Sequence, residues 1–352
     1  MKNSNDNYNS TKATGTRQKP TAIELFAGAG GFALGLEKAG FEVVALNDSD
    51  KYACETLRHN RPEWNVIEGD VHSINWSDYK ADIVAGGFPC QPFSHAGKRL
   101  GLEDVRGTLF YEFARCVKEA RPSIFIGENV YGLKTHGDGK TLKVIVSVME
   151  SLGYHVQYQI LDAADYDVPQ KRKRIFIVGT LPGITFRFPK PSGNIIPLKE
   201  GLKGVPESDG ATYSKTREDV LKLIPPGGSW INLPKELQLK YMGKSYYSGG
   251  GKRGAARRLS WVEPSPTLTT SPSQKLTEFC HPDQTRPLTV REYARIQTFP
   301  DEWQFAGGTA AKYRQIGNAA PVNLAKALGR ALIKALGTKE TEKLVSMMNE
   351  SF

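Results

Sequence analysis

Short apolar segments alternate with segments of helical periodicity from Thr21 to Thr180. The apolar segments are rich in β-branched residues and carry few charges, which is typical of strands buried on both faces of a parallel sheet. Between them, apolar residues recur three and four positions apart, as in amphipathic helices. This alternation predicts an α/β fold with a doubly wound, mostly parallel sheet. We expect strands at 22–26, 42–46, 81–87, 123–130 and 174–180, and helices at 31–40, 108–120 and 141–153.

The pattern changes after Leu181, where prolines and glycines become frequent and clear periodicity is lost. Helical periodicity returns at 286–299 and at 323–337, and the second of these segments carries one apolar stripe that predicts packing against the sheet. We therefore expect a disordered tail over 1–20, a sheet domain over 21–180 plus 310–337, a smaller irregular domain over 181–309, and a C-terminal tail over 338–352.

The charge balance favours a polyanionic partner. The 352 residues hold 47 Lys and Arg against 37 Asp and Glu, a formal net charge of +10. Such an excess is typical of proteins that bind nucleic acid, although basic enzymes with other substrates exist. The segment 240–258 combines six basic residues with tyrosines and glycines and holds no acid. It is either a solvated loop or a surface whose cations neutralise phosphates, with Lys252, Arg253, Arg257 and Arg258 as candidate contacts.

Other features narrow the class of protein. No segment approaches the ~18 uninterrupted apolar residues of a membrane helix, and the polar N-terminus has no apolar core like that of a signal peptide. The four cysteines are far apart and form no C-x-x-C pair, which argues against a metal site or a disulfide framework. We expect a cytoplasmic protein without membrane or metal.

A glycine-rich turn follows the first predicted strand and opens the first helix. In FAGAGGFALG, Gly28, Gly30 and Gly31 permit a tight turn and a close approach of a ligand to the helix N-terminus. Asp48, at the end of the next strand, is placed to hold a ribose diol. Asp70 follows a third apolar run and could contact an adenine amino group or cap a helix. These residues fit a nicotinamide cofactor and S-adenosylmethionine equally well.

Cys90 differs from the other three cysteines in its surroundings. It lies in GGFPCQPFS, directly after a predicted strand, between Pro89 and Pro92. Prolines stiffen this turn, and the carboxyl edge of an open α/β sheet is where such folds bind their ligands. Most cysteines are small buried hydrophobes, and we assign that role to Cys54, Cys116 and Cys280. A rigid loop at the ligand edge favours a nucleophile at Cys90 instead.

Two further strand ends bring charged side chains to the same edge. Glu128 ends the strand in SIFIGENV, where a carboxyl group either caps a helix or acts on a bound base. Gln170, Arg172 and Arg174 form a Q-x-R-x-R pattern that leads into the last strand. Because alternate residues of a strand share a face, we expect Arg172 and Arg174 to point the same way, toward Glu128 and a base carbonyl, unless the run is merely basic surface.

The ordered segments FAGAGG, PCQ, ENV, Q-x-R-x-R, RPLTVREYARIQTFPD and QIGNAAPV resemble the DNA cytosine-5 methyltransferase family, of the compact bacterial restriction-modification type. The resemblance extends from Ile23 to about Leu336. It implies a catalytic domain completed by a C-terminal helix, and a small domain for target recognition. It also implies S-adenosyl-L-methionine as the cofactor and double-stranded DNA as the substrate, whose target cytosine is flipped out and attacked by Cys90.

The resemblance assigns roles residue by residue. Glu128 would hold the cytosine N3 and amino group, with Arg172 and Arg174 in support. Ser94 and Arg106, in a loop that closes over DNA, are implied DNA contacts, and Gln170 and Thr267 are counted with them. The cofactor would lie among residues of the glycine turn, the strand ends and the C-terminal segment, namely Phe26, Gly28, Gly30, Asp48, Asp70 and Asn318.

Two positions depart from the family pattern, and several alternatives stay open. Ser49 stands where many members stack an aromatic ring on adenine, and Ala319 stands where a serine is common. A dehydrogenase would leave the PCQ and Q-x-R-x-R segments unused, an amino-group methyltransferase would need no cysteine, and an RNA cytosine methyltransferase shares the chemistry. We expect a monomer that acts at the nucleoid, paired with a restriction endonuclease of the same specificity but in no stable complex with it.

Overall fold

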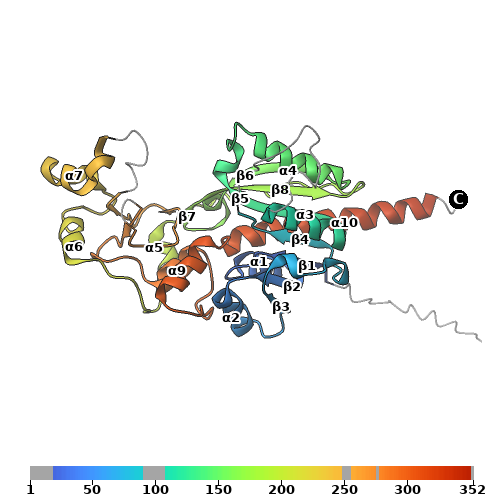
Figure 1. The fold of residues 1–352 in the computed structure, drawn as a ribbon, viewed down its shortest axis with the longest axis horizontal. Helices are drawn as coiled ribbons and strands as arrows, with labels where there is room; N and C mark the ends of the chain where they lie inside the picture. The colour runs from blue at the N-terminus through green and yellow to red at the C-terminus, as the bar shows by residue number, and fades with distance from the viewer. Residues whose placement is uncertain (1–18, 90–107, 248–254, 275–276, 350–352) are drawn as a thin grey trace, which may run out of the picture.

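The computed structural model describes residues 19–89, 108–247, 255–274 and 277–349. Figure 1 shows a sheet domain and a smaller, irregular part, with the helix α9 and its surroundings between them. Within the described residues, no helix is both long enough and apolar enough to cross a membrane. Those residues also contain no cluster of three metal-binding side chains.

A seven-stranded sheet forms the centre of the larger domain. Its strand order is β3-β2-β1-β4-β5-β8-β6, and only β8 runs antiparallel to its neighbours β5 and β6. This confirms the predicted α/β class with a mostly parallel sheet. The strands are β1 (Thr21–Leu25), β2 (Glu42–Asp48), β3 (Val66–Glu68), β4 (Ile83–Gly86), β5 (Ile124–Val130), β6 (His155–Asp162) and β8 (Lys173–Thr180).

Helices cover both faces of this sheet. On one face, α1 packs along α10, and Leu36, Leu328 and Leu332 are fully buried in their contact with the strands. On the other, Phe113 and Val148 from α3 and α4 pack on Phe125 of β5. The helices of this domain are α1 (Gly31–Ala39), α2 (Lys51–Asn60), α3 (Leu109–Ala120), α4 (Lys140–Ser151) and α10 (Val322–Asn349), with 3-10 turns η1 (Val71–Ser73), η2 (Trp76–Asp78), η4 (Tyr131–Lys134) and η5 (Ala163–Tyr166).

The smaller part has little regular structure. Its own hydrophobic cluster includes Leu221, Trp230 and Met242. Two two-residue strand pairings, β7 with β10 and β9 with β11, and several short helices supply backbone hydrogen bonds. The elements after β6 and outside the large sheet are β7 (Gln170–Lys171), α5 (Leu198–Gly201), α6 (Lys215–Leu221), η6 (Trp230–Asn232), α7 (Lys235–Met242), η7 (Gly243–Tyr247), β9 (Arg257–Arg258), β10 (Ser265–Pro266), β11 (Phe279–Cys280), α8 (Val290–Ile296) and α9 (Thr309–Asn318).

Two expectations about the elements differ from the structure. The edge strand β6 was not predicted, because its sequence HVQYQILD alternates little and most of its side chains are exposed or half-buried. Residues 338–349, which we expected in a tail, continue α10. Residues 286–318, with α8 and α9, connect the two domains, and Tyr293 and Phe299 share one hydrophobic cluster with Leu34 of α1. We call this segment the domain junction.

Candidate active site

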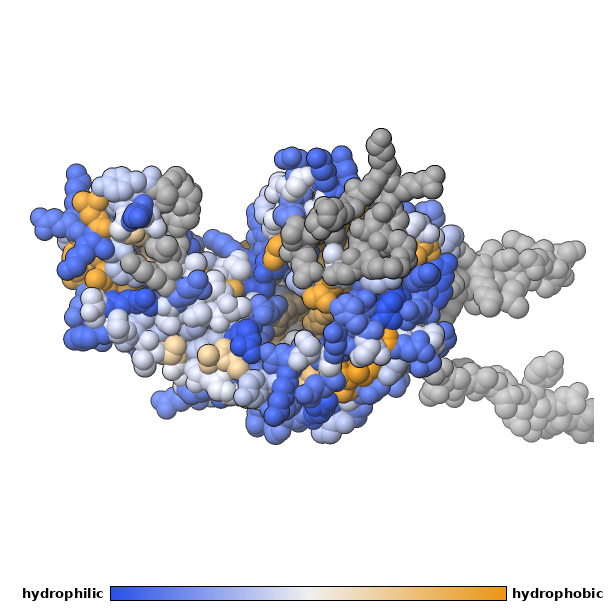
Figure 2. Space-filling model, viewed as in Figure 1, coloured by the Kyte–Doolittle hydropathy of each residue, from blue (hydrophilic) through white to orange (hydrophobic). Residues whose placement is uncertain are grey.

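A cavity of about 530 Å³ lies at the carboxyl edge of the sheet, where β1, β2, β4 and β5 end. Residues of the domain junction and of the segment 268–270 close its other side. Figure 2 shows the molecular surface hollowed between the two parts of the molecule. The charged and polar side chains that line the cavity are Glu24, Asp48, Glu128, Asn129, Arg172, Arg174, Thr269, Thr270 and Asn318.

The glycine turn shapes one wall of this cavity. Gly28 has φ of +53°, and a Cβ there would meet nothing within 4 Å, so its backbone is open to a ligand. Its N–H donates to Asp48 Oδ2 at 2.7 Å, which joins the turn to the end of β2. Phe26 and Asp48 line the same cavity, and burial raises the pKa of Asp48. These three predicted cofactor residues therefore lie together.

Gly30 and Asp70 do not line this cavity, and the structure gives each of them a role in the fold. Gly30 caps α1 with φ of +80°, and a Cβ there would lie 2.5 Å from Leu57 Cδ2, so close packing explains this glycine. Asp70 is exposed; its carboxylate caps η1 through the N–H of His72 and contacts the ring of that histidine. The capping role was the alternative that the sequence left open.

Glu24 is a cavity residue that the sequence analysis missed. It lies within β1 and is almost fully buried, and its Oε2 has no hydrogen-bond partner. Burial raises its pKa, although the N–H of Ala33 in α1 opposes that rise. The signal was present in the sequence, because a carboxylate inside the apolar segment AIELF would be buried on either face of a parallel sheet.

Glu128 and Arg174 form an ion pair inside the cavity. Glu128 Oε1 lies 2.9 Å from Arg174 Nε, and both side chains are largely buried. The pair follows from sheet register, because Glu128 of β5 is two positions from the residue opposite Arg174 in β8. Burial raises the pKa of Glu128, while the charges of Arg174 and Arg172 act against that rise. The carboxyl group therefore holds its proton more tightly than an exposed glutamate.

Arg172 lines the same cavity, as the alternation of strand residues predicts, but its hydrogen bonds lead elsewhere. Its guanidinium donates to the carbonyl of Leu268 at 3.3 Å and to that of Gly317 at 2.9 Å. Its Nε is buried without a partner, and burial lowers its pKa. Arg172 thus ties the small domain and α9 to the cavity wall.

Asn129 positions the segment that leads to Cys90. Its side-chain amide is buried and donates to the carbonyl of Phe88 at 2.8 Å, two residues before the cysteine. The ENV segment therefore supplies two functional side chains, of which the sequence analysis identified one. Cys90 itself lies outside the described residues, as do the predicted DNA contacts Ser94, Arg106, Lys252 and Arg253.

Gln170, which the sequence analysis counted as a DNA contact, lies in the contact between the two domains. It is fully buried. Its Oε1 accepts the N–H of Leu268 at 2.9 Å, and its Nε2 donates to Gln297 Oε1 at 2.8 Å. Gln297 in turn donates to the carbonyls of Ile316 and Ala319, on either side of Asn318. This relay holds Asn318 at the cavity. Next to it, the half-buried Thr267 donates to the carbonyl of Lys171.

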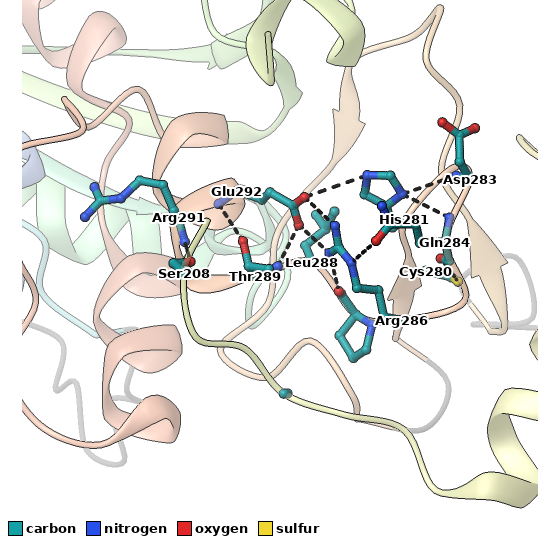
Figure 3. A network of polar contacts seen from close by, with 12 residues as sticks. Ser208, Cys280, His281, Asp283, Gln284, Arg286, Leu288, Thr289, Arg291 and Glu292 are labelled. Atoms are coloured by element: carbon teal, nitrogen blue, oxygen red, sulfur yellow. Dashed lines mark hydrogen bonds and ion pairs between the residues drawn. The ribbon is translucent and has the colours of Figure 1, made fainter. Parts of the chain in front are cut away.

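A second polar network organises the domain junction (Figure 3). Thr289 and Glu292 form a capping box at the N-terminus of α8. The buried Glu292 carboxylate accepts two hydrogen bonds from Arg286, at 2.7 and 2.8 Å, and one from the N–H of Thr289 at 2.7 Å. The ring of His281 lies 3.7 Å from it. Burial acts to raise the pKa of Glu292, but the hydrogen bonds from Arg286 and the N–H of Thr289, together with the nearby positive charge, outweigh burial and lower this pKa.

Arg258, another predicted DNA contact, has a structural role. It is buried, and its guanidinium donates to the carbonyls of Leu221, Ile224 and His281 at 2.8, 2.6 and 3.1 Å. In a region with little secondary structure, one arginine thus satisfies carbonyls of two segments that are distant in sequence. Its neighbour Arg257 is half-buried and lines another cavity with Thr267 and Lys171.

The three described cysteines are buried. Burial raises the pKa of all three thiols, that of Cys54 to about 12. None of them lines the cavity at the sheet edge.

Known DNA methyltransferases resemble this chain over most of its length. The model of the C-5 cytosine-specific DNA methylase family matches residues 21–334. The chain is 55% identical over 330 residues to the Type II methyltransferase M.Eco47II of Escherichia coli, covering 90% of this chain and 79% of that one. It is 54% identical to M.Sau96I of Staphylococcus aureus, with 89% and 76% covered.

Solved structures agree in fold. A DNA modification methyltransferase encoded within a prophage of Escherichia coli superposes with a TM-score of 0.66 at 24% identity, covering 90% of this chain and 99% of that one. DNMT2 of Spodoptera frugiperda superposes with a TM-score of 0.65 at 17% identity, covering 89% and 99%.

Proposed function

Because the chain belongs to the C-5 cytosine-specific DNA methylase family, we propose that it methylates carbon 5 of a cytosine within one double-stranded DNA sequence. The donor is S-adenosylmethionine, and Cys90 adds covalently to a base that has been flipped out of the duplex. The observation that carries this proposal is the buried Glu128–Arg174 pair, in one cavity with the residues that precede Cys90. The cavity thus contains the Glu128 carboxyl group, whose pKa is raised, close to the segment that leads to Cys90.

The cavity fits the cofactor chemically. S-adenosylmethionine supplies an electrophilic methyl group on a sulfonium, and it also carries an ammonium group. The unpartnered Oε2 of Glu24 lies buried in the wall of the cavity, where a cation compensates the burial of a carboxylate. Phe26, Gly28 and Asn318 line the same space, and Asp48 lies within reach of a ribose. We assign these residues to the cofactor.

Cys90 makes carbon 5 reactive. Cytosine carbon 5 is a weak nucleophile, and addition of the Cys90 thiolate to carbon 6 gives it enamine character. Glu128, whose pKa is raised, donates a proton to N3 and so draws electrons from carbon 6 during the attack. Arg174 holds the Glu128 carboxyl group in place. After methylation, a base such as water takes the proton from carbon 5, and the electron pair of that bond expels Cys90 as the thiolate. N3 returns its proton to Glu128, which regenerates the free enzyme.

The target cytosine must leave the DNA duplex to reach this cavity. Unstacking one base costs roughly a few kcal/mol, which contacts between protein and DNA offset. Thr267 and Arg257 are the described residues that we retain as candidate DNA contacts, together with Ser94, Arg106, Lys252 and Arg253. We further propose a monomer that acts at the bacterial nucleoid in the cytoplasm, protecting a site that a separate restriction endonuclease cuts.

Bisulfite sequencing of DNA from cells that express the protein tests the activity and gives the recognition sequence. We expect protected cytosines at one recurrent sequence. The Cys90→Ala variant should lose methylation completely while it still binds DNA, and Cys116→Ala, with a buried thiol on α3, is the matched control that stays active. Methylation by Cys90→Ala would refute the covalent mechanism, and methylation of RNA instead of duplex DNA would refute the substrate.

A further inference from the structure

A second groove lies on the sheet domain, between α10 and the segment 185–192 that follows β8. Its volume is about 930 Å³. It shares no residue with the cavity at the sheet edge. Figure 1 shows α10 leading away from the domain junction toward the C-terminus, so the groove extends outward from the junction. Asn323, at its inner end, donates to the carbonyl of Asp167 at 2.9 Å.

The groove is lined by five basic residues and a single acid, Asp167. The basic residues come from both of its walls and are Arg187, Lys190, Lys326, Arg330 and Lys334. Within the part of the chain that the structure describes, none of the five forms an ion pair, whereas Arg115, Arg286 and Arg295 each have a carboxylate partner. The positive charge of the groove is therefore not compensated from within the described residues.

Three of these cations form a row on α10. Lys326, Arg330 and Lys334 follow one another at intervals of four residues, so they lie on one face, ~6 Å apart along the axis. Like charges at this spacing repel one another and destabilise a helix. The helix dipole gives no compensation, because α10 begins at Val322 and continues to Asn349, far beyond the row. Because this row of cations opposes the folding of its own helix, we expect it to serve in binding. A linear row of positive charges matches an extended anion.

The floor of the groove is apolar. Phe188, Ala327 and Ala331 are half-buried there, between the basic walls. A row of cations about 12 Å long matches several negative charges in line better than one isolated ion. The substrate of this family is a polyanion that extends far beyond any recognition sequence, with one negative charge per ~1.7 Å of duplex.

We propose that this groove binds the phosphodiester backbone of DNA outside the catalytic cavity, without reading sequence. The inference rests on the proposed action on DNA but not on the chemistry at Cys90. Each neutralised phosphate contributes about 0.9 to the slope of log affinity against log salt concentration. The groove would hold the enzyme on flanking DNA while the small domain reads the target.

The triple variant K326E/R330E/K334E tests this proposal. Its control, K38E/K80E/K118E, changes the net charge equally, at exposed lysines that line neither cavity. Equilibrium binding is measured against salt for a duplex that just contains the recognition sequence and for the same duplex with long flanks. We expect the groove variant to lose tenfold or more in affinity for the long duplex only, with the salt slope reduced by about 2–3. The control should keep the parent values.

Three outcomes would overturn the proposal: unchanged binding of the long duplex, an equal loss on both duplexes, or an equal loss in the control. Inorganic phosphate, added at constant ionic strength, should not displace the long duplex; selective displacement would indicate a site for a single anion. Thermal unfolding of both variants checks that they fold. Binding of the short duplex reports the proposed action on DNA, and the added affinity for the long duplex reports the groove. Failure of the groove proposal is therefore distinguishable from failure of the proposed function.

Discussion

At the cavity edge, Glu24 lies buried with one oxygen unpartnered and Glu128 is paired with Arg174, whereas at the domain junction Glu292 is surrounded by donors. The pKa of the first two is raised, mainly by burial, and that of Glu292 is lowered by Arg286 and by a backbone N–H. A buried carboxylate oxygen that lacks a hydrogen-bond donor, as in Glu24, is a candidate for contact with a ligand. A buried carboxylate whose oxygens accept several hydrogen bonds, as in Glu292, serves to hold the fold. The same residue type therefore serves chemistry in one region and architecture in the other.

The largest expected effect comes from Glu128. Glu128→Gln keeps the shape of the side chain but removes the proton that the raised pKa retains, so we expect the rate of methyl transfer to fall by about 10²–10⁴. Single-turnover assays with saturating DNA measure this rate, and Glu150→Gln, at an exposed position of α4, is the matched control. Urea unfolding checks that the variant folds, because the substitution removes the carboxylate partner of Arg174. A folded variant with the parent rate would contradict the assignment.

The adjacent residues Arg257 and Arg258 have different proposed roles, in DNA binding and in folding, which can be tested separately. Arg258→Met leaves several buried carbonyls without a donor and should lower the free energy of unfolding by about 3–5 kcal/mol. Arg257→Met should change stability by less than about 1 kcal/mol and instead reduce the salt slope of DNA binding by about 1. Urea unfolding and binding titrations separate the two results. A stable Arg258→Met variant with weakened DNA binding would restore the role that its sequence suggested.

The smallest effect depends on pH. The folded-state pKa of Glu292 is lowered, so its stabilising contribution is present above the unfolded pKa, near 4.3, and is lost as the pH falls through the folded value. Glu24 and Glu128 have the opposite sign: their contribution is present below the unfolded pKa and is lost as the pH rises through their raised folded values. Lowering the pH should therefore reduce the contribution of the domain junction to the free energy of unfolding and increase that of the cavity edge.

Glu292→Gln tests this opposition. At neutral pH it should reduce the free energy of unfolding by about 2–3 kcal/mol, less than for a fully buried pair because Arg286 is partly exposed. The difference from the parent should shrink as the pH is lowered below about 4, where Glu292 itself takes up a proton. Urea unfolding at a series of pH values measures it, with the exposed Glu236→Gln as control. A constant difference across pH would show that the charge of Glu292 is not the cause.

The sequence predicts most of the sheet domain because its signals are local. Buried parallel strands are continuous apolar runs, and their carboxyl ends bring Asp48 and Glu128 to one edge whatever the remaining chain does. Arg174 follows from alternation along β8. The helices that cover the two faces of the sheet are predicted in the same way, by apolar residues spaced three and four positions apart.

The residues that sequence reasoning misplaced depend on distant segments. Arg258 and Gln170 are polar and lie near basic or catalytic motifs, but their partners are 23–37 and 98–127 residues away. No periodicity encodes which carbonyls an irregular region leaves for an arginine to satisfy. The function of Gly30 likewise depends on Leu57 of another helix, and a glycine fingerprint does not separate packing from ligand contact.

The burial of three thiols has a practical consequence for labelling. A thiolate-directed reagent distinguishes cysteines by exposure and by the fraction ionised. Cys54, Cys116 and Cys280 are buried, with raised pKa values, so they should react only when the native structure opens. Rapid modification of the native protein can therefore be assigned to Cys90 by elimination. A wild-type chain thus offers one addressable position for a spectroscopic probe or a mechanism-based trap, without a cysteine-free background.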